Sequence, residues 1–209
     1  MKLPYPPLLV ITDRKHARAP LKDILAAAFE AGCRWASVRE KDLPAGEQVA
    51  LARELHAVAR KWNSRLTLHG DPALAKEADV DGVHLSAGSD AASARQLLGA
   101  HVLIGLSVHH VEEARALDPA VIDYLVAGPA YATASKPGYG PFLGMTGIAA
   151  ICEATAIPVI AIGGITEHGV DDMDTAGAAG VAVMGGVMRA DDPGKEVASL
   201  IATLADESL

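Results

Sequence analysis

Residues 158–186 read PVIAIGGITEHGVDDMDTAGAAGVAVMGG and contain the same pattern twice. Each copy is a short apolar run of strand length, at 158–162 and at 180–184, that ends in a pair of glycines. Gly163-Gly164 and Gly185-Gly186 leave backbone N–H groups free of side chains, so an anion can approach them closely. Two such pairs after successive strands predict a phosphate site like the one after strands seven and eight of a (β/α)8 barrel. The alternative is that the glycines only close tight turns.

The chain before this stretch repeats one alternation, an apolar run followed by a helical stripe. Further strands are expected at residues 8–11, 35–38, 66–68, 82–85, 102–107 and 124–127. The intervening segments have apolar residues at helical spacing, as in the first of them with Leu21, Ile24, Leu25 and Ala28. Eight such units predict an α/β fold, a small single-domain (β/α)8 TIM barrel over residues 1–209 with its phosphate site after strands 7 and 8.

Composition limits the class of ligand. The chain has 209 residues, is half hydrophobic and carries a net charge of −8, which argues against nucleic-acid and membrane partners. Small phosphorylated molecules are the expected partners, and a homo-oligomer is left open. No apolar run could cross a bilayer, and prolines interrupt residues 1–7, so we expect a cytoplasmic protein without a signal peptide. Cys33 and Cys152 are isolated and are expected to be core thiols.

Polar residues follow most of the expected strands, and in a barrel they would meet at one mouth. Residues 128–144 are rich in Gly and Pro and are expected to form an irregular loop long enough to act as a lid. Cations near the glycine pairs predict a ligand with several phosphate charges. The polar residues in question are Arg39 and Lys41, His69 and Asp71, Ser86, Ser89 and Asp90, Ser107 and His109, and Thr133, Ser135 and Lys136.

Several of these residues also have an interpretation that involves no function. Arg39 and Lys41 could pair with Glu40 and Asp42 as a solvated ion cluster. His84 lies within a strand and is expected first as a hydrogen-bonded histidine of the barrel interior, and only second as a catalytic group. His109 and His110 open a helix and are expected at the surface.

Several motifs together resemble the thiamine phosphate synthase and TenI family, in the family's order and over nearly the whole chain. Each fragment alone is weak, and their combination is specific. The motifs are Thr12-Asp13, Val38-Arg39-Glu40-Lys41, Asp81-Gly82-Val83-His84-Leu85, Ile104-Gly105-Leu106-Ser107, Gly128-Pro129 with Thr133-Ala134-Ser135-Lys136, and Ile160-Ala161-Ile162-Gly163-Gly164-Ile165.

The resemblance implies a thiamine biosynthesis transferase. Such a synthase joins an aminopyrimidine-methyl diphosphate to a thiazole phosphate and releases pyrophosphate, with Mg²⁺ on the diphosphate. It implies catalytic roles for Arg39, Lys41, Lys136 and Ser107. It implies substrate binding by Thr133, Ser135, His69, Gly163, Gly164, Gly185 and Gly186, and a metal role for Asp71 and Asp90.

The chain departs from both branches of the family. Synthases typically have Asn-Asp after the third strand, Gly-Gln-x-Asp after the fourth and a Gln two residues before the arginine. Here these places read His69-Gly70, residues 86–89 (SAGS) and Ser37, so Asp71 and Asp90 stand one residue late. These replacements resemble the TenI branch, a thiazole tautomerase, yet Pro129 stands where that branch has its catalytic histidine. The synthase is favoured; the tautomerase and a non-catalytic thiazole or thiamine phosphate binder are the alternatives.

Overall fold

The computed structural model describes residues 3–133 and 140–206. The strands are β1 (Leu8–Ile11), β2 (Trp35–Val38), β3 (Arg65–His69), β4 (Gly82–Leu85), β5 (Leu103–Val108), β6 (Tyr124–Ala127), β7 (Val159–Ile162) and β8 (Gly180–Val183). The helices are α1 (Leu21–Glu30), α2 (Ala45–Lys61), α3 (Pro72–Ala78), α4 (Ala91–Leu98), α5 (Val111–Arg115), α6 (Gly144–Ala154), α7 (Glu167–Thr175), α8 (Gly185–Arg189) and α9 (Pro193–Asp206).

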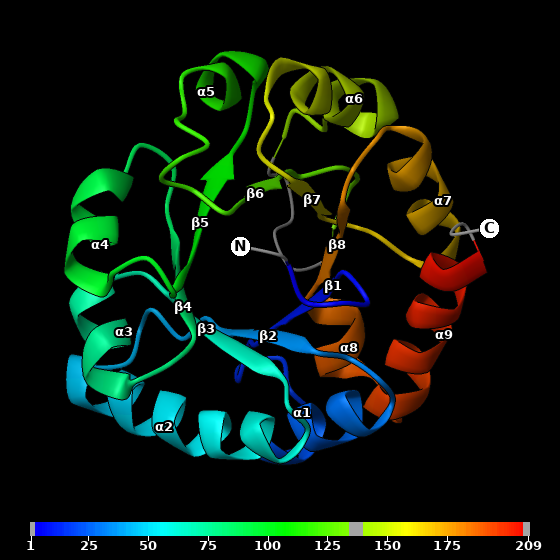
Figure 1. Cartoon of the computed structure of the whole chain (residues 1–209). Coiled ribbons are helices and arrows are strands. Elements are labelled where there is room, and N and C mark those ends of the chain that lie inside the picture. Colours follow the sequence, from blue (N-terminus) through cyan, green and yellow to red (C-terminus); the bar gives the residue numbers. More distant parts are fainter. Residues whose placement is uncertain (1–2, 134–139, 207–209) are drawn as a thin grey trace.

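The strands form a closed parallel barrel in the order β1 to β8, with β8 pairing back to β1. Figure 1 shows the strands as an inner ring inside a ring of helices. Most strands are buried along their whole length, because helices cover one face and the barrel interior the other. Every predicted strand is present, with its ends within one residue of the prediction, so the predicted (β/α)8 TIM barrel is confirmed.

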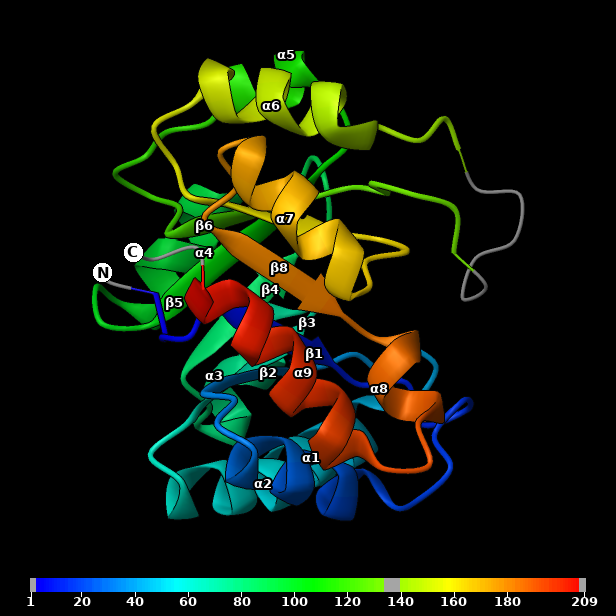
Figure 2. The same cartoon turned by 90° about the vertical axis from the view of Figure 1, so that its right-hand side faces the viewer.

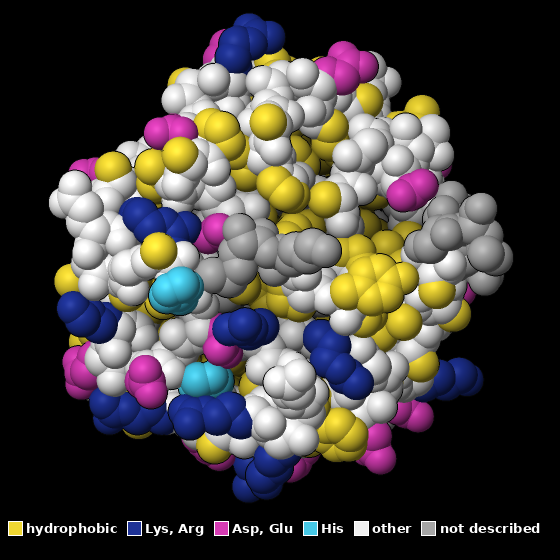
Figure 3. Space-filling model, viewed as in Figure 1, with side chains coloured by type: hydrophobic (Ala, Val, Ile, Leu, Met, Phe, Trp, Pro, Cys, Tyr) yellow, Lys and Arg dark blue, Asp and Glu magenta, His cyan; other side chains and the backbone are white. Residues whose placement is uncertain are grey.

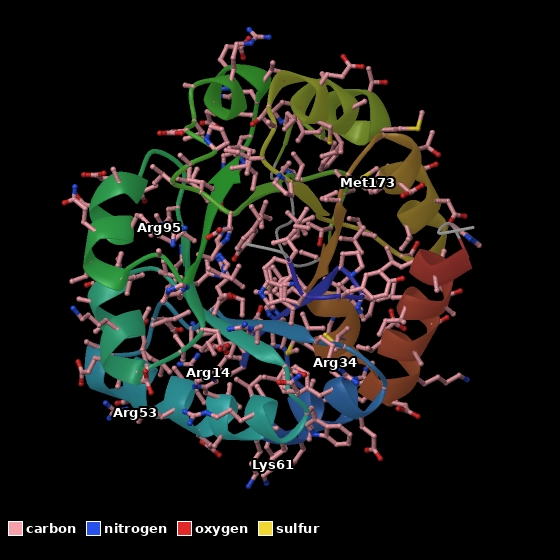
Figure 4. The ribbon with its side chains drawn as sticks, viewed as in Figure 1. Arg14, Arg34, Arg53, Lys61, Arg95 and Met173 are labelled. Atoms are coloured by element: carbon pink, nitrogen blue, oxygen red, sulfur yellow. The ribbon has the colours of Figure 1, made fainter. Side chains whose placement is uncertain are left out.

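The barrel interior is filled by side chains and contains the largest buried rings. Trp35 and Tyr124 meet edge to face with ring centroids 4.6 Å apart. Gly105 pairs with Tyr124 across β5 and β6, and a Cβ on Gly105 would lie 2.0 Å from the tyrosine ring. Outside the strands a second, larger apolar layer packs against the helices, while Arg53 and Lys61 of α2 lie on its outer side (Figure 4). Cys33 belongs to this layer as the predicted core thiol.

The two ends of the barrel differ. In Figure 2 the β8 arrow points to the right, and α8 lies on that side, so this end carries the carboxyl ends of the strands. Figure 3 shows the opposite end, on which basic, acidic and apolar side chains are mixed. A cavity of about 380 Å³ at that end is lined by Leu3, Pro4, Tyr5, Arg34, Asn63, Arg65 and Leu103. Across the described ranges, no helix is long and apolar enough to span a membrane.

The connection from β6 to α6 is the irregular segment that the sequence predicts. Its described parts, residues 128–133 and 140–143, contain no helix or strand. Ser135 and Lys136 lie outside the described residues. Tyr131 donates a hydrogen bond from its hydroxyl to Asp172 of α7, which joins the start of this connection to the neighbouring unit. The short helix α8, directly after β8, was not predicted.

Candidate active site

A cavity of about 360 Å³ opens at the carboxyl ends of the strands. It receives side chains from both halves of the barrel, and no Asp or Glu is among its described lining residues. Basic, imidazole and hydroxyl groups line it together with backbone and apolar surface. The polar lining residues are Arg39, His69, His84, Ser107, His109, Thr133, Thr166 and Arg189. A cavity of this character favours an anionic ligand with an apolar ring.

Both glycine pairs lie at this cavity, as the sequence predicts. Gly163 and Gly164 follow β7 with φ angles of +107° and +66°, a backbone region that other residues rarely adopt. A Cβ on Gly164 would lie 2.4 Å from the carbonyl oxygen of Ala132, so close packing also requires glycine there. Gly185 and Gly186 form the first turn of α8, where backbone N–H groups have no acceptor within the helix.

Arg189 is a cavity residue that the sequence analysis missed. It ends α8 and follows Gly185 by four residues, so both lie on one side of the helix. That spacing is the signal by which Arg189 could have been found. Its guanidinium brings a positive charge to the side of the cavity where the glycine pairs lie.

Two histidines form a polar network on the inner wall. His84 is fully buried and is bonded through Nε2 to Ser107 Oγ at 2.9 Å, and through Nδ1 to the Tyr124 hydroxyl at 3.3 Å. The His69 ring lies 4.2 Å from that of His84, and its Nδ1 is 3.2 Å from Ser37 Oγ. Burial, with the nearby charges of Lys41 and Arg39, lowers the pKa of His84 to about 3. His84 is therefore the neutral, hydrogen-bonded interior histidine expected from the sequence.

Arg39 and Lys41 reach the same mouth from the end of β2. Arg39 lines the cavity, and Lys41 Nζ donates to Ser86 Oγ at 3.2 Å, which connects the loops after β2 and β4.

The acidic neighbours of these two cations have other partners. Glu40 is buried and accepts hydrogen bonds from the Thr12 hydroxyl and the Arg14 backbone. Asp42 pairs with Arg14 and Lys15, whose hydrogen bonds lower the pKa of its carboxyl to about 2. The ion pairs of Glu40 and Asp42 thus run to Arg14 and Lys15 in the loop after β1.

His109 lines the cavity, so of the two positions considered for it from the sequence, the mouth of the barrel and the surface, the structure shows the first. Its Nδ1 lies 2.8 Å from the carbonyl oxygen of Gly128. A carbonyl can only accept, so Nδ1 carries the proton and Nε2 is the basic nitrogen. His110, the next residue, lies at the surface as predicted, beside Glu112 and Glu113.

Comparison with known proteins assigns the family. The model of the family described as "Thiamine monophosphate synthase" matches residues 8–187. The chain belongs to the thiamine monophosphate synthase family. The matched part of the chain runs from the start of β1 into α8, across all eight strands of the barrel.

Individual relatives agree with the thiamine monophosphate synthase family. A protein of Geobacter sulfurreducens named "Putative thiamine-phosphate synthase" is 39% identical over 201 residues, covering 94% of this chain and 93% of the relative. A "Thiamine-phosphate synthase" of Roseiflexus sp. is 35% identical over 97% of this chain and 89% of its own length. The structure titled "Thiamine phosphate pyrophosphorylase from Pyrococcus furiosus" superimposes with a TM-score of 0.85 at 28% identity, over 97% of this chain and 96% of that chain.

Asp71 and Asp90, which the family resemblance assigns to magnesium, each cap a helix. Asp71 caps α3 by accepting from the backbone N–H of Ala73 at 2.8 Å, and Asp90 caps α4 through the backbone and hydroxyl of Ser93. Neither lines the cavity. Within residues 3–133 and 140–206, no group of three or more His, Cys, Asp or Glu side chains could hold a metal ion. The described residues therefore do not form the family's expected metal site.

Proposed function

We propose that the protein is a thiamine phosphate synthase, a transferase that joins an aminopyrimidine-methyl diphosphate to a thiazole phosphate. The observation that carries this proposal is one cavity with glycine pairs after β7 and β8 and with Arg39 and Lys41 across the mouth. Each substrate has its own phosphate or diphosphate group. Arg39 and Lys41 provide a place for the diphosphate, and the glycine pairs provide a place for the thiazole phosphate. Membership of the family supports this substrate pair.

The reaction requires stabilisation of the leaving group. The bond between the pyrimidine methylene carbon and the diphosphate oxygen breaks, and both electrons stay with pyrophosphate. The thiazole nitrogen donates its lone pair to the methylene carbon and forms the new C–N bond. Arg39 and Lys41 stabilise the charge that develops on pyrophosphate, and Lys136 and Ser135, which lie outside the described residues, act with them from the β6–α6 connection.

The remaining polar residues position the two rings. Gly163, Gly164, Gly185 and Gly186 hold the thiazole phosphate through their backbone N–H groups, and Arg189 adds a charge beside them. Ser107 stands at the pyrimidine side, fixed by its hydrogen bond to neutral His84. Thr133 and His69 complete the contacts at the mouth.

A tautomerase is the second candidate, and one observation favours it. His109 Nδ1 bonds the carbonyl of Gly128, directly before Pro129, the position of the TenI branch's catalytic histidine. The basic Nε2 of His109 could then transfer the proton that aromatises a thiazole phosphate carboxylate. In the synthase reaction no such proton transfer is needed, so the two candidates make different use of His109.

Two assays on the purified protein separate the candidates. In the first, pyrimidine diphosphate and thiazole phosphate are supplied and pyrophosphate release and thiamine phosphate are followed. In the second, the aromatisation of thiazole phosphate carboxylate is followed. We expect the first reaction, and a loss of about tenfold in its rate for Lys136→Ala, equivalent to about 1.4 kcal/mol of transition-state stabilisation. Aromatisation alone, lost in His109→Gln, would assign the tautomerase; ligand binding without turnover would assign a binder.

A further inference from the structure

The diphosphate side of the mouth carries cations, and none of the described residues that line the cavity is a carboxylate. Arg39 lines the cavity, and Lys41 bonds Ser86 across the loops that follow β2 and β4. In a magnesium-dependent site, carboxylates hold the ion and the ion holds the diphosphate. Here the described lining residues include Arg, His, Ser and Thr and no acid. Nearby acids could hold a metal there only if their carboxylates turned toward the ligand.

The acids at the ends of β1 to β4 are already engaged. Each accepts hydrogen bonds or ion pairs that hold its loop or begin its helix, and rotation of the carboxylate toward a metal would oppose these contacts. The contacts are Asp13 with His16 and Lys15, Glu40 with Thr12 and Arg14, Asp42 with Arg14 and Lys15, Asp71 with Ala73, and Asp90 with Ser93.

The backbone after β3 gives an independent argument. Gly70, at the place where synthases typically have an aspartate, has a φ of +121°, and its N–H donates to the carbonyl of His84 at 3.0 Å. A residue with a side chain is strained at this φ. Position 70 therefore has no carboxylate, and its backbone conformation disfavours an aspartate there.

We propose that this protein binds the diphosphate as the metal-free anion, neutralised directly by Arg39 and Lys41. This inference rests on the proposed synthase function. Mg²⁺ would be repelled by the two cations and would find no described carboxylate on the cavity wall. It would also cancel two of the negative charges by which diphosphate is attracted to Arg39 and Lys41. The absence of acids among the described lining residues and the presence of Arg39 and Lys41 thus both favour binding of the metal-free diphosphate.

Calorimetry with inorganic pyrophosphate tests the proposal without turnover. The full chain is titrated in EDTA and again in excess Mg²⁺. We expect binding in EDTA that is at least as tight as in Mg²⁺, and at least about tenfold weaker for Lys41→Ala in EDTA. Binding that needs Mg²⁺, or no binding under either condition, overturns the proposal.

A gain of carboxylate provides a second test. Ser89 is exposed and stands where the family's second aspartate is expected, so Ser89→Asp adds an acid beside the diphosphate side of the mouth. We expect Ser89→Asp to weaken pyrophosphate binding in EDTA by about fivefold or more, with recovery in Mg²⁺. Asn63→Asp is the matched control, because it adds the same charge at the opposite end of the barrel. Equal effects of the two variants contradict the proposal.

The product assay separates this inference from the proposed function. Thiamine phosphate formed in EDTA supports both. Thiamine phosphate formed only with Mg²⁺, together with Mg²⁺-dependent pyrophosphate binding, leaves the synthase function intact and overturns metal-free binding. If no thiamine phosphate forms under either condition, the synthase function fails, and the inference fails with it as a statement about that reaction's leaving group.

Discussion

At the scale of single residues, Gly186 is the cleanest position at which to test the phosphate site. It is exposed, and a Cβ there would meet only Glu196 Oε1, the end of a flexible side chain, at 3.3 Å. Gly164 is less suitable, since a Cβ there would collide with the Ala132 backbone. We expect Gly186→Asp to weaken thiazole phosphate binding at least about tenfold, because its charge opposes the phosphate. Calorimetry measures the loss.

Gly186→Asn is the control for this prediction, since it has the same size without the charge. We expect Gly186→Asn to lose less affinity than Gly186→Asp, and both variants to keep the native circular dichroism spectrum. Unchanged affinity in folded Gly186→Asp would show that the phosphate does not bind at the glycine pair that begins α8.

His84 gives a pH dependence to stability. Its pKa falls from 6.5 to about 3 in the folded protein, so the unfolded chain binds a proton that the folded chain does not between these values. Stability therefore decreases as the pH falls through this window. Between pH 7 and pH 5 we expect His84 to cost about 2 kcal/mol of unfolding free energy. Urea unfolding of the wild type and His84→Gln at both pH values checks this, and the same pH slope in both would refute it.

The sequence predicted some of the residues that line the cavity and missed others. Arg39, Ser107 and the glycine pairs could be placed at the cavity because they directly follow or end apolar runs, and such residues share one mouth in a barrel. Arg189 could not, because it lies on the short helix α8, which the sequence analysis did not predict. The partners of Glu40 and Asp42 were equally hidden, since Arg14 and Lys15 come from a loop about 28 positions earlier.

At the scale of elements, the cap of α3 distinguishes a structural from a metal-binding role for Asp71. Its side chain satisfies the backbone N–H of Ala73. We expect Asp71→Ala to lower stability by about 1 kcal/mol and to leave pyrophosphate affinity within about twofold, whereas Asp71→Asn keeps the cap and stability. Chemical denaturation and calorimetry, with and without Mg²⁺, provide both readings. A magnesium-dependent affinity that disappears in Asp71→Asn would restore the metal role.

Most strands and helices could be predicted from the sequence. Strands such as β4 and β6 are short apolar runs because helices and barrel interior bury both faces. Helix α8 escaped prediction because five residues are too few to show a helical period, and its first turn is formed by the glycines that also predict the phosphate site. The β6–α6 connection was predicted from its many Gly and Pro residues. These residues indicate irregular structure but do not determine the path of the backbone.

At the scale of the whole molecule, the barrel separates stability from chemistry. The carboxyl end holds the cavity, while the interior packing around Trp35 and Tyr124 holds the strands together. Arg95 similarly ties α4 to the start of β6, by donating to Asp123 at 2.6 Å and to the carbonyl of Val121, and it points from α4 toward the barrel in Figure 4. Changes in these regions should affect unfolding before they affect ligand binding.

Gly105 allows this separation to be tested, because Tyr124 occupies the space beside it. A Cβ at residue 105 would lie 2.0 Å from the ring, and a closed barrel gives β5 and β6 little freedom to move apart. We expect Gly105→Ala to lower the unfolding free energy by about 2 kcal/mol or more in one cooperative transition. In a Tyr124→Leu background the same change should cost less than about 1 kcal/mol, since the ring is gone. Urea denaturation of the four proteins measures this coupling, and an equal cost of Gly105→Ala in both backgrounds would mean that the ring does not restrict residue 105.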